Sequence, residues 1–122
     1  MKESDIMRSI QLELSKNPGI RLFRNNVGVL RDENGTPVRY GLCTGSSDLI
    51  GWTAVTITPS MVGRKLAIFT AQEVKTEAGR VTDEQTAFLS CVKKAGGIAG
   101  VVRSVDDALE LVDITREIDD ET

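Results

Sequence analysis

The sequence predicts one compact domain of helices and strands, in the α/β or α+β class, and two observations lead to this prediction. Apolar residues recur at helical spacing near the start of the chain and again in its second half, with strand-like segments between these regions. A chain of 122 residues, 40% of them hydrophobic, suits a single core. The expected order of elements is α-β-β-β-α-β-α.

The first expected element is a helix near the amino terminus. Its apolar positions share one face, and they are Ile6, Met7, Ile10 and Leu14. The "NPG" cluster at residues 17–19 ends the helix. At about 100° per residue, Glu3 projects near the centre of the apolar face. An acid on that face suggests a functional role, although Glu3 also complements the positive end of the helix dipole.

Strands are expected next. Residues 20–42 contain strand-like stretches around Asn34 and Gly35, a pair typical of a hairpin turn. Residues 46–57 and 64–75 read as two further strands, and we expect them at the centre of the sheet.

The strand in residues 64–75 ends with two opposite charges, Glu73 and Lys75. Successive side chains of a strand point to opposite faces, so these two share a face, whereas Val74 points the other way and into the core. Taken alone, the two residues also fit a solvated ion pair at a strand end, worth about 0 to 1 kcal/mol.

The second half of the chain predicts a helix, a short strand and a last helix. Thr82 with Gln85 three positions later matches a capping box, and a Gly-Gly pair ends that helix. Its expected buried positions are Ala87, Phe88, Cys91 and Val92. Residues 97–104 read as an apolar strand, and Ser104 caps the last helix.

Features that the sequence lacks exclude several classes of function. No apolar run of about 18 residues and no signal-peptide pattern is present, so we expect a cytoplasmic protein without membrane contact. Without histidine the chain has no imidazole base, and Cys43 and Cys91 do not form a zinc-binding pattern. No glycine-rich nucleotide loop is found, so no nucleotide cofactor is expected. Catalysis would rest on carboxylates, lysine and a hard metal ion.

The charge balance permits a nucleic-acid partner. The net charge is −3, but residues 113–122 hold five acidic residues and one basic residue. Of the 18 acidic and 15 basic residues, 13 and 14 remain in residues 1–112, a net charge of +1. We expect a single domain in residues 1–112 followed by an acidic tail.

Three acids and one lysine form a candidate site for phosphodiester hydrolysis. Glu3 lies on the first helix, and Asp48 follows a Gly-Ser-Ser turn at a strand start. Glu73 and Lys75 stand at a strand exit. Carboxylates hold Mg²⁺ or Mn²⁺ against a phosphate oxygen, and a cation steadies the developing charge. Asp48 also fits an ordinary turn residue, and Gln85 fits a capping box with no further role.

The sequence resembles a known family, most specifically in residues 45–108. The segments "GSSDLIG" and "EVKTEAGRVTDEQTAFLSCVKKAGGIAGVVRSVDDA" are similar to those of the VRR-NUC family of the PD-(D/E)XK nuclease superfamily, found alone in phages and within larger repair nucleases. The resemblance runs from the first helix to about Val112. It implies an α/β fold with a restriction-endonuclease-like core of order α-β-β-β-α-β, whose central mixed sheet is flanked by helices. For a phage-encoded chain, the cytoplasm would be that of the host.

The resemblance also implies a catalytic set, made of Glu3, Asp48, Glu73, Lys75 and Gln85. Asp48 and Glu73 would bind Mg²⁺ or Mn²⁺, and Val74 would add its backbone carbonyl. Glu3 would join this metal-binding set. Lys75 resembles the catalytic lysine, and Gln85 resembles the glutamine that supports the site.

These features together predict a divalent-metal-dependent DNA endonuclease. Stand-alone members of the family resemble DNA-repair enzymes that cut four-way (Holliday) junctions as homodimers, so branched DNA is the expected substrate. Two alternatives stay open: a nuclease for flaps, nicks or duplex DNA that works with a partner, and a non-catalytic DNA-binding module. Basic residues that would contact phosphates, or simply add solubility, are Arg21, Arg24, Arg31, Arg39, Arg64, Lys65 and Arg80.

Overall fold

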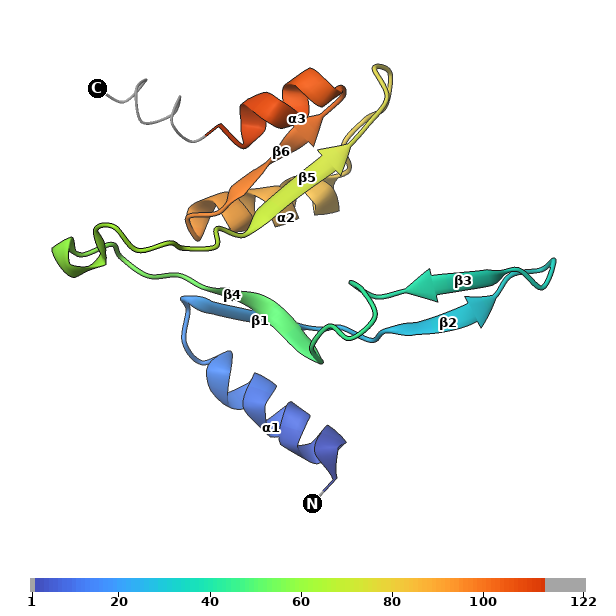
Figure 1. Ribbon diagram of the computed structural model, residues 1–122, viewed down its shortest axis with the longest axis horizontal. Helices are drawn as coiled ribbons and strands as arrows, with labels where there is room; N and C mark the ends of the chain where they lie inside the picture. Colours follow the sequence, from blue (N-terminus) through green and yellow to red (C-terminus); the bar gives the residue numbers. More distant parts are fainter. Residues whose placement is uncertain (1, 114–122) are drawn as a thin grey trace. The chain divides into compact units, whose positions relative to one another are not determined.

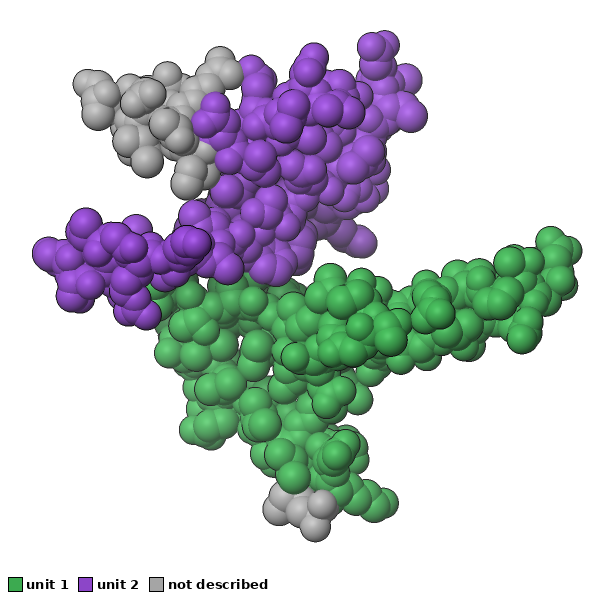
Figure 2. Space-filling view, in the orientation of Figure 1, with its two compact units in different colours: residues 1–55 green, residues 56–122 purple. Residues whose placement is uncertain are grey.

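The computed structural model describes residues 2–113 of the chain as a mixture of helices and strands (Figure 1). The mixed α/β class expected from the sequence is therefore confirmed. Of the expected acidic tail, residues 114–122 lie outside the described residues. The chain forms two compact units, Met1–Val55 and Thr56–Thr122 (Figure 2), and each is described on its own. Within residues 2–113, no helix has the length and apolar character needed to cross a membrane.

The first unit consists of one helix and two antiparallel strand pairs. Strand β1 pairs with β4, and β2 pairs with β3 as a hairpin (Figure 1). The elements are α1 (Glu3–Leu14), β1 (Ile20–Arg24), β2 (Gly28–Arg31), β3 (Pro37–Tyr40) and β4 (Leu49–Thr53). Helix α1 ends before the "NPG" cluster as expected, and the Asn17 side chain there accepts a hydrogen bond from the Gly19 N–H at 2.9 Å.

The hairpin turn forms where the Asn34-Gly35 pair predicts it. Gly35 has a positive φ of 79°, a conformation that glycine adopts without steric penalty. The Asp32 carboxylate accepts hydrogen bonds from the N–H groups of Asn34 and Thr36, both at 2.9 Å. A short polar side chain thus closes the turn on its own backbone.

The second unit is built around two parallel strands joined by a helix. Strand β5 (Thr70–Val74) leads through α2 (Asp83–Lys94) to β6 (Ile98–Val102), and α3 (Val105–Leu111) follows. A short 3₁₀ helix, Pro59–Met61, precedes β5. A helical crossover is the usual way to bring two consecutive strands parallel, because a tight turn reverses the chain.

The helix caps of the second unit agree with the sequence. The Thr82 hydroxyl accepts from the Gln85 N–H at 3.1 Å, and the Gln85 side-chain oxygen accepts from the Thr82 N–H at 3.0 Å. Both halves of the predicted capping box are therefore present. At α3, the Ser104 hydroxyl accepts from the Asp107 N–H at 3.0 Å, as expected of an N-cap.

The buried face of α2 differs from the expected one. Leu89 and Val92 are buried, whereas Phe88 is 40% exposed and Ala87 is exposed. Of the expected stripe, Val92 is correct, Cys91 is half-buried, and Ala87 and Phe88 are wrong. A pair of strands is too narrow to cover a broad helix face, so α2 buries only a thin seam. Gln85 lies on that seam, because positions i, i+4 and i+7 share one side of a helix.

The expected sheet also differs from the observed pairings. In residues 2–113, five strands precede α2 instead of three. The strands pair into two-stranded sheets, β1 with β4, β2 with β3 and β5 with β6. Residues 64–75 contribute only Thr70–Val74, because the ladder with β6 is five residues long. The single central sheet stays a prediction.

The Val74 side chain does not point into a core as expected; it is 73% exposed. Its register partner on β6, Val102, is buried. Helix α3 packs mainly against β6. Over β5 it reaches Gln72, whose amide donates to the Ala108 carbonyl at 3.3 Å, but it leaves Val74 uncovered.

Candidate active site

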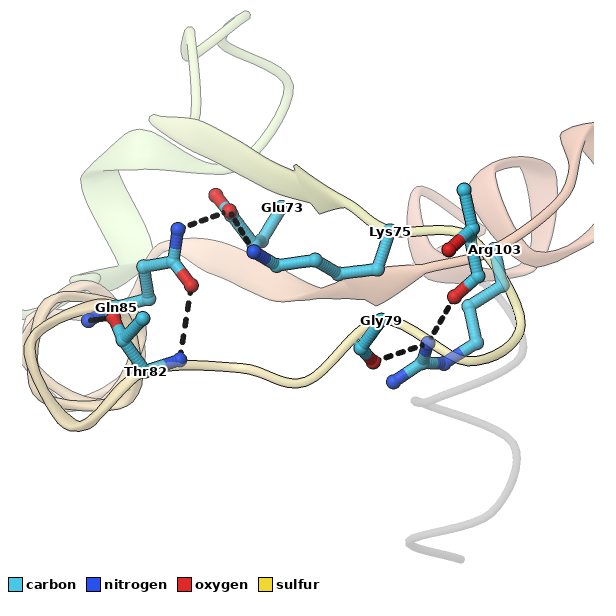
Figure 3. Close-up of polar contacts among 7 residues, drawn as sticks. Glu73, Lys75, Gly79, Thr82, Gln85 and Arg103 are labelled. Atoms are coloured by element: carbon cyan, nitrogen blue, oxygen red, sulfur yellow. Dashed lines mark hydrogen bonds and ion pairs between the residues drawn. The ribbon is translucent and has the colours of Figure 1, made fainter.

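Glu73 and Lys75 lie together at the exit of β5 (Figure 3). The Lys75 Nζ atom lies 3.4 Å from the Glu73 Oε1 atom, and the two side chains are 20% and 29% exposed, respectively. Strand alternation places both on the half-buried face with Ala71, whereas Gln72 and Val74 are exposed. The pair is therefore a partly desolvated contact on the inner face of the strand.

Gln85 joins this pair from the first turn of α2. Its amide Nε2 donates to the Glu73 Oε1 atom at 2.5 Å (Figure 3). Its amide oxygen is already committed to the Thr82 N–H, so only the nitrogen side can face the carboxylate. The capping box and the site contact are thus made by one side chain at the same time.

The two oxygens of Glu73 have different surroundings. Oε1 receives the Gln85 amide and lies near the Lys75 ammonium. Oε2 takes no hydrogen bond from any side chain or backbone group within residues 2–113. One carboxylate oxygen is held in place and the other is available to a further ligand.

The Val74 carbonyl points away from β6. In a parallel ladder, alternate residues bond to the same neighbouring strand. The Phe69 carbonyl accepts a hydrogen bond from the Ile98 N–H, and the Lys75 N–H donates to the Val102 carbonyl. The backbone groups of the odd-numbered residues of β5 therefore form the hydrogen bonds to β6. The Val74 carbonyl therefore lies on the opposite edge of β5, where no strand pairs with it in the described part of the chain.

Asp48 is an exposed residue directly before β4. Its side chain lines a shallow pocket of about 180 Å³ in the first unit, together with Glu3 and the apolar residues of α1. Glu3 shares this pocket with Ile6, Met7 and Ile10, so it lies on the helix face that the sequence predicts. Two of the predicted acids thus meet in one place within Met1–Val55.

Asn25 organises the loop that precedes Asp48, and sequence reasoning missed it. Its side-chain amide donates to the Ser46 hydroxyl at 2.7 Å and to the Ser47 carbonyl at 2.9 Å, and its oxygen accepts from the Leu42 N–H at 2.9 Å. Its backbone N–H donates to the Asp48 carbonyl at 2.8 Å. The available signal was an Asn-Asn pair directly after a strand, a place where a short amide can bind neighbouring backbone.

A second residue missed by sequence reasoning is Arg103, which follows β6. Its guanidinium donates to backbone carbonyls of the loop that follows Lys75 (Figure 3). Its position between a strand and a helix N-cap was the only signal in the sequence.

The acids do not form a closed metal cluster in the described structure. Within residues 2–113, no group of three or more acidic or cysteine side chains is close enough to hold a metal ion together. Glu3 and Asp48 belong to the first unit, and Glu73 belongs to the second.

The basic residues expected to contact DNA are all exposed but do not share one surface. Arg21 and Arg24 lie on opposite faces of the β1–β4 pair, since they are three positions apart on one strand. Arg31 and Arg39 lie on the same face of the hairpin. The predicted DNA contacts in the second unit, which are Arg64, Lys65 and Arg80, are exposed as well.

We predict that Asn25→Leu lowers the free energy of unfolding by about 1 to 3 kcal/mol, because the Leu42 N–H and the Ser47 carbonyl lose their partner. Urea unfolding measures this loss. Asn26→Leu is the matched control, because Asn26 is the exposed neighbour. Equal midpoints for the two variants would contradict the organising role of Asn25.

Comparison with known proteins places these residues in a family. The family model of the VRR-NUC domain matches residues 30–106, which is more than half of the 122-residue chain. The matched range contains Asp48, Glu73, Lys75 and Gln85, whereas Glu3 lies before it. No curated protein and no solved structure gives a significant match. The chain belongs to the VRR-NUC family, and it carries a nuclease-type domain.

Proposed function

We propose that the protein is a divalent-metal-dependent DNA endonuclease and that Glu73, Lys75 and Gln85 form part of its active site. The observation that carries this proposal is the Glu73 carboxylate, held at Oε1 by the Gln85 amide and lying 3.4 Å from the Lys75 ammonium. A nuclease needs a fixed carboxylate beside a cation, and family membership supplies the reaction class.

The donor atoms fit a hard cation. The open Oε2 atom of Glu73 and the Val74 carbonyl are both oxygen ligands of the kind that Mg²⁺ and Mn²⁺ prefer. Asp48 would supply a second carboxylate, and Glu3 would add to it. An ion bound by these residues would supply Lewis-acid stabilisation of charge on a phosphate oxygen.

The remaining chemistry belongs to side chains of this chain. Lys75 carries three N–H donors, and the one facing Glu73 leaves the others free to reach a water molecule or a phosphate oxygen. A preoriented ammonium at that point stabilises negative charge as it develops in the transition state. Gln85 acts on Glu73, since its amide fixes the orientation of the carboxylate.

For the substrate, we propose branched DNA, cut as four-way junctions by a homodimer. A symmetric dimer presents two equivalent active sites, which matches the two-fold symmetry of a four-way junction. The exposed basic residues of both units would contact phosphates and position the DNA without reading its sequence. The central mixed sheet of the superfamily is the fold that we propose for the complete core.

The direct test is cleavage of a labelled immobile four-way junction in Mg²⁺, beside the matching linear duplex and a 5′-flap. Paired symmetric nicks confined to the junction would support a junction resolvase. Cleavage of the flap or duplex would support the nuclease activity and contradict the proposal that four-way junctions are the substrate. No cleavage in either Mg²⁺ or Mn²⁺ would contradict the proposed activity and favour a DNA-binding module.

We predict that Glu73→Gln and Asp48→Asn abolish this cleavage while DNA binding persists or tightens. Each substitution removes a proposed ligand and also removes negative charge that repels phosphate. Cleavage assays and DNA titrations at one salt concentration measure the two effects separately. Glu84→Gln, at an exposed position in the first turn of α2, is the charge-matched control and should cleave as the wild type does.

Lys75→Ala is expected to reduce the turnover number by about 10² to 10³, the range found when one preoriented charge-stabilising donor is removed. Mg²⁺ binding, followed by calorimetry, should change little because the proposed ligands remain. Lys94→Ala, at an exposed position in the last turn of α2, controls for loss of positive charge. A wild-type turnover number in Lys75→Ala would contradict the assignment of Lys75 to the active site.

A further inference from the structure

Arg103 binds three backbone carbonyls of one short loop. It stands between the end of β6 and Ser104, the N-cap of α3. Its Nη1 group donates to the Gly79 carbonyl at 2.8 Å (Figure 3). The same group donates to the Thr76 carbonyl and, at 3.3 Å, to the Glu77 carbonyl. Its own backbone N–H donates to the Asp107 carboxylate at 2.9 Å, which fixes the residue to the first turn of α3.

The bound loop directly follows Lys75. The Gly79 N–H donates to the Thr76 carbonyl at 3.0 Å, which closes a tight turn over residues 76–79. Carbonyl oxygens that converge on one point repel each other, so a cation between them favours this turn over more open conformations.

The turn also touches the base of the Lys75 side chain. A Cβ atom placed on Gly79 would lie 3.3 Å from the Lys75 Cβ atom, so the turn packs closely against it. On its other side, the Lys75 N–H is held by the Val102 carbonyl at 3.1 Å. The position of Lys75 is therefore fixed by its backbone hydrogen bond to β6 and by its packing against the turn.

We propose that Arg103 is a positioning residue for Lys75: by holding the turn at residues 76–79, it directs the Lys75 ammonium toward Glu73 and the reacting phosphate. This inference rests on the proposed function, because it assigns to Arg103 a role in that same active site. Arg103 itself is exposed at the surface, so its contacts contribute to local order and little to the buried core.

The test compares Arg103→Met with Arg103→Lys in steady-state DNA cleavage. Arg103→Met removes every donor and should lower kcat by about 10- to 100-fold, since small misplacement of a catalytic group has effects of this size. KM for DNA should stay within about 3-fold of the wild type. Arg103→Lys keeps the charge and should recover part of kcat. Arg8→Met, at an exposed position on α1, is the matched control.

A double-mutant cycle separates positioning from general stability. In a Lys75→Ala background there is no ammonium to direct, so Arg103→Met should change the residual kcat by less than about 2-fold. An equal fractional loss of kcat with and without Lys75 would overturn the proposal. A raised KM with unchanged kcat would also overturn it and would make Arg103 a DNA contact.

Amide hydrogen exchange gives a readout that does not need activity. Exchange of the Gly79 and Lys75 N–H groups should be faster in Arg103→Met than in the wild type, while exchange in α2 stays unchanged. Wild-type exchange at Gly79 and Lys75 would overturn the inference. If the wild-type protein cleaves no DNA, the proposed function fails on its own, and these exchange rates still decide whether Arg103 holds the turn and Lys75.

Discussion

The carboxylate of Glu73 is the group on which the rest of the candidate active site depends. At 29% exposure it has lost much of its hydration, and a buried charge is unfavourable unless donors or a cation replace the water. Gln85 and Lys75 meet that need at one oxygen. Each contact requires a particular local structure. Gln85 must lie on the inner seam of α2, and the Lys75 side chain must lie on the same face of β5 as Glu73.

At the start of α2, the Gln85 side chain makes two contacts that place it on the inner seam. The Gln85 oxygen completes the capping box with Thr82, and its nitrogen binds Glu73. The helix therefore begins where it does for a local reason, and that beginning also delivers the donor to the carboxylate. Leu89 and Val92 continue the same seam into the core of the second unit, so packing of α2 and orientation of Glu73 are coupled.

Features governed by short-range rules could be predicted from the sequence. Strand alternation predicts the shared face of Glu73 and Lys75, and local capping rules predict the ends of α2. The buried face of α2 was only partly predicted, because Phe88 suits a core by composition but a two-stranded sheet covers only Leu89 and Val92. The exposure of Val74 follows from where α3 packs, which no local pattern encodes.

The residues that sequence reasoning missed share one kind of contact. Asn25 and Arg103 both bind the backbone of a loop distant in sequence, and each loop adjoins a predicted site residue, Asp48 or Lys75. Such contacts have no periodicity, and any surface asparagine or arginine could make them. The strand pairings of the whole core have the same difficulty, because pairing partners are chosen over long sequence distances.

The most direct measurement of the central claim is Mg²⁺-dependent cleavage by Gln85→Glu, with urea unfolding of the same variant. Glutamate fits the capping box as well as glutamine does, but it places a second carboxylate against Glu73. The account predicts a free energy of unfolding lower by about 1 to 3 kcal/mol, because Glu73 loses its amide donor, and a loss of cleavage of at least about 10-fold. Wild-type cleavage in this variant would contradict the claim that the Gln85 amide holds the Glu73 carboxylate for catalysis.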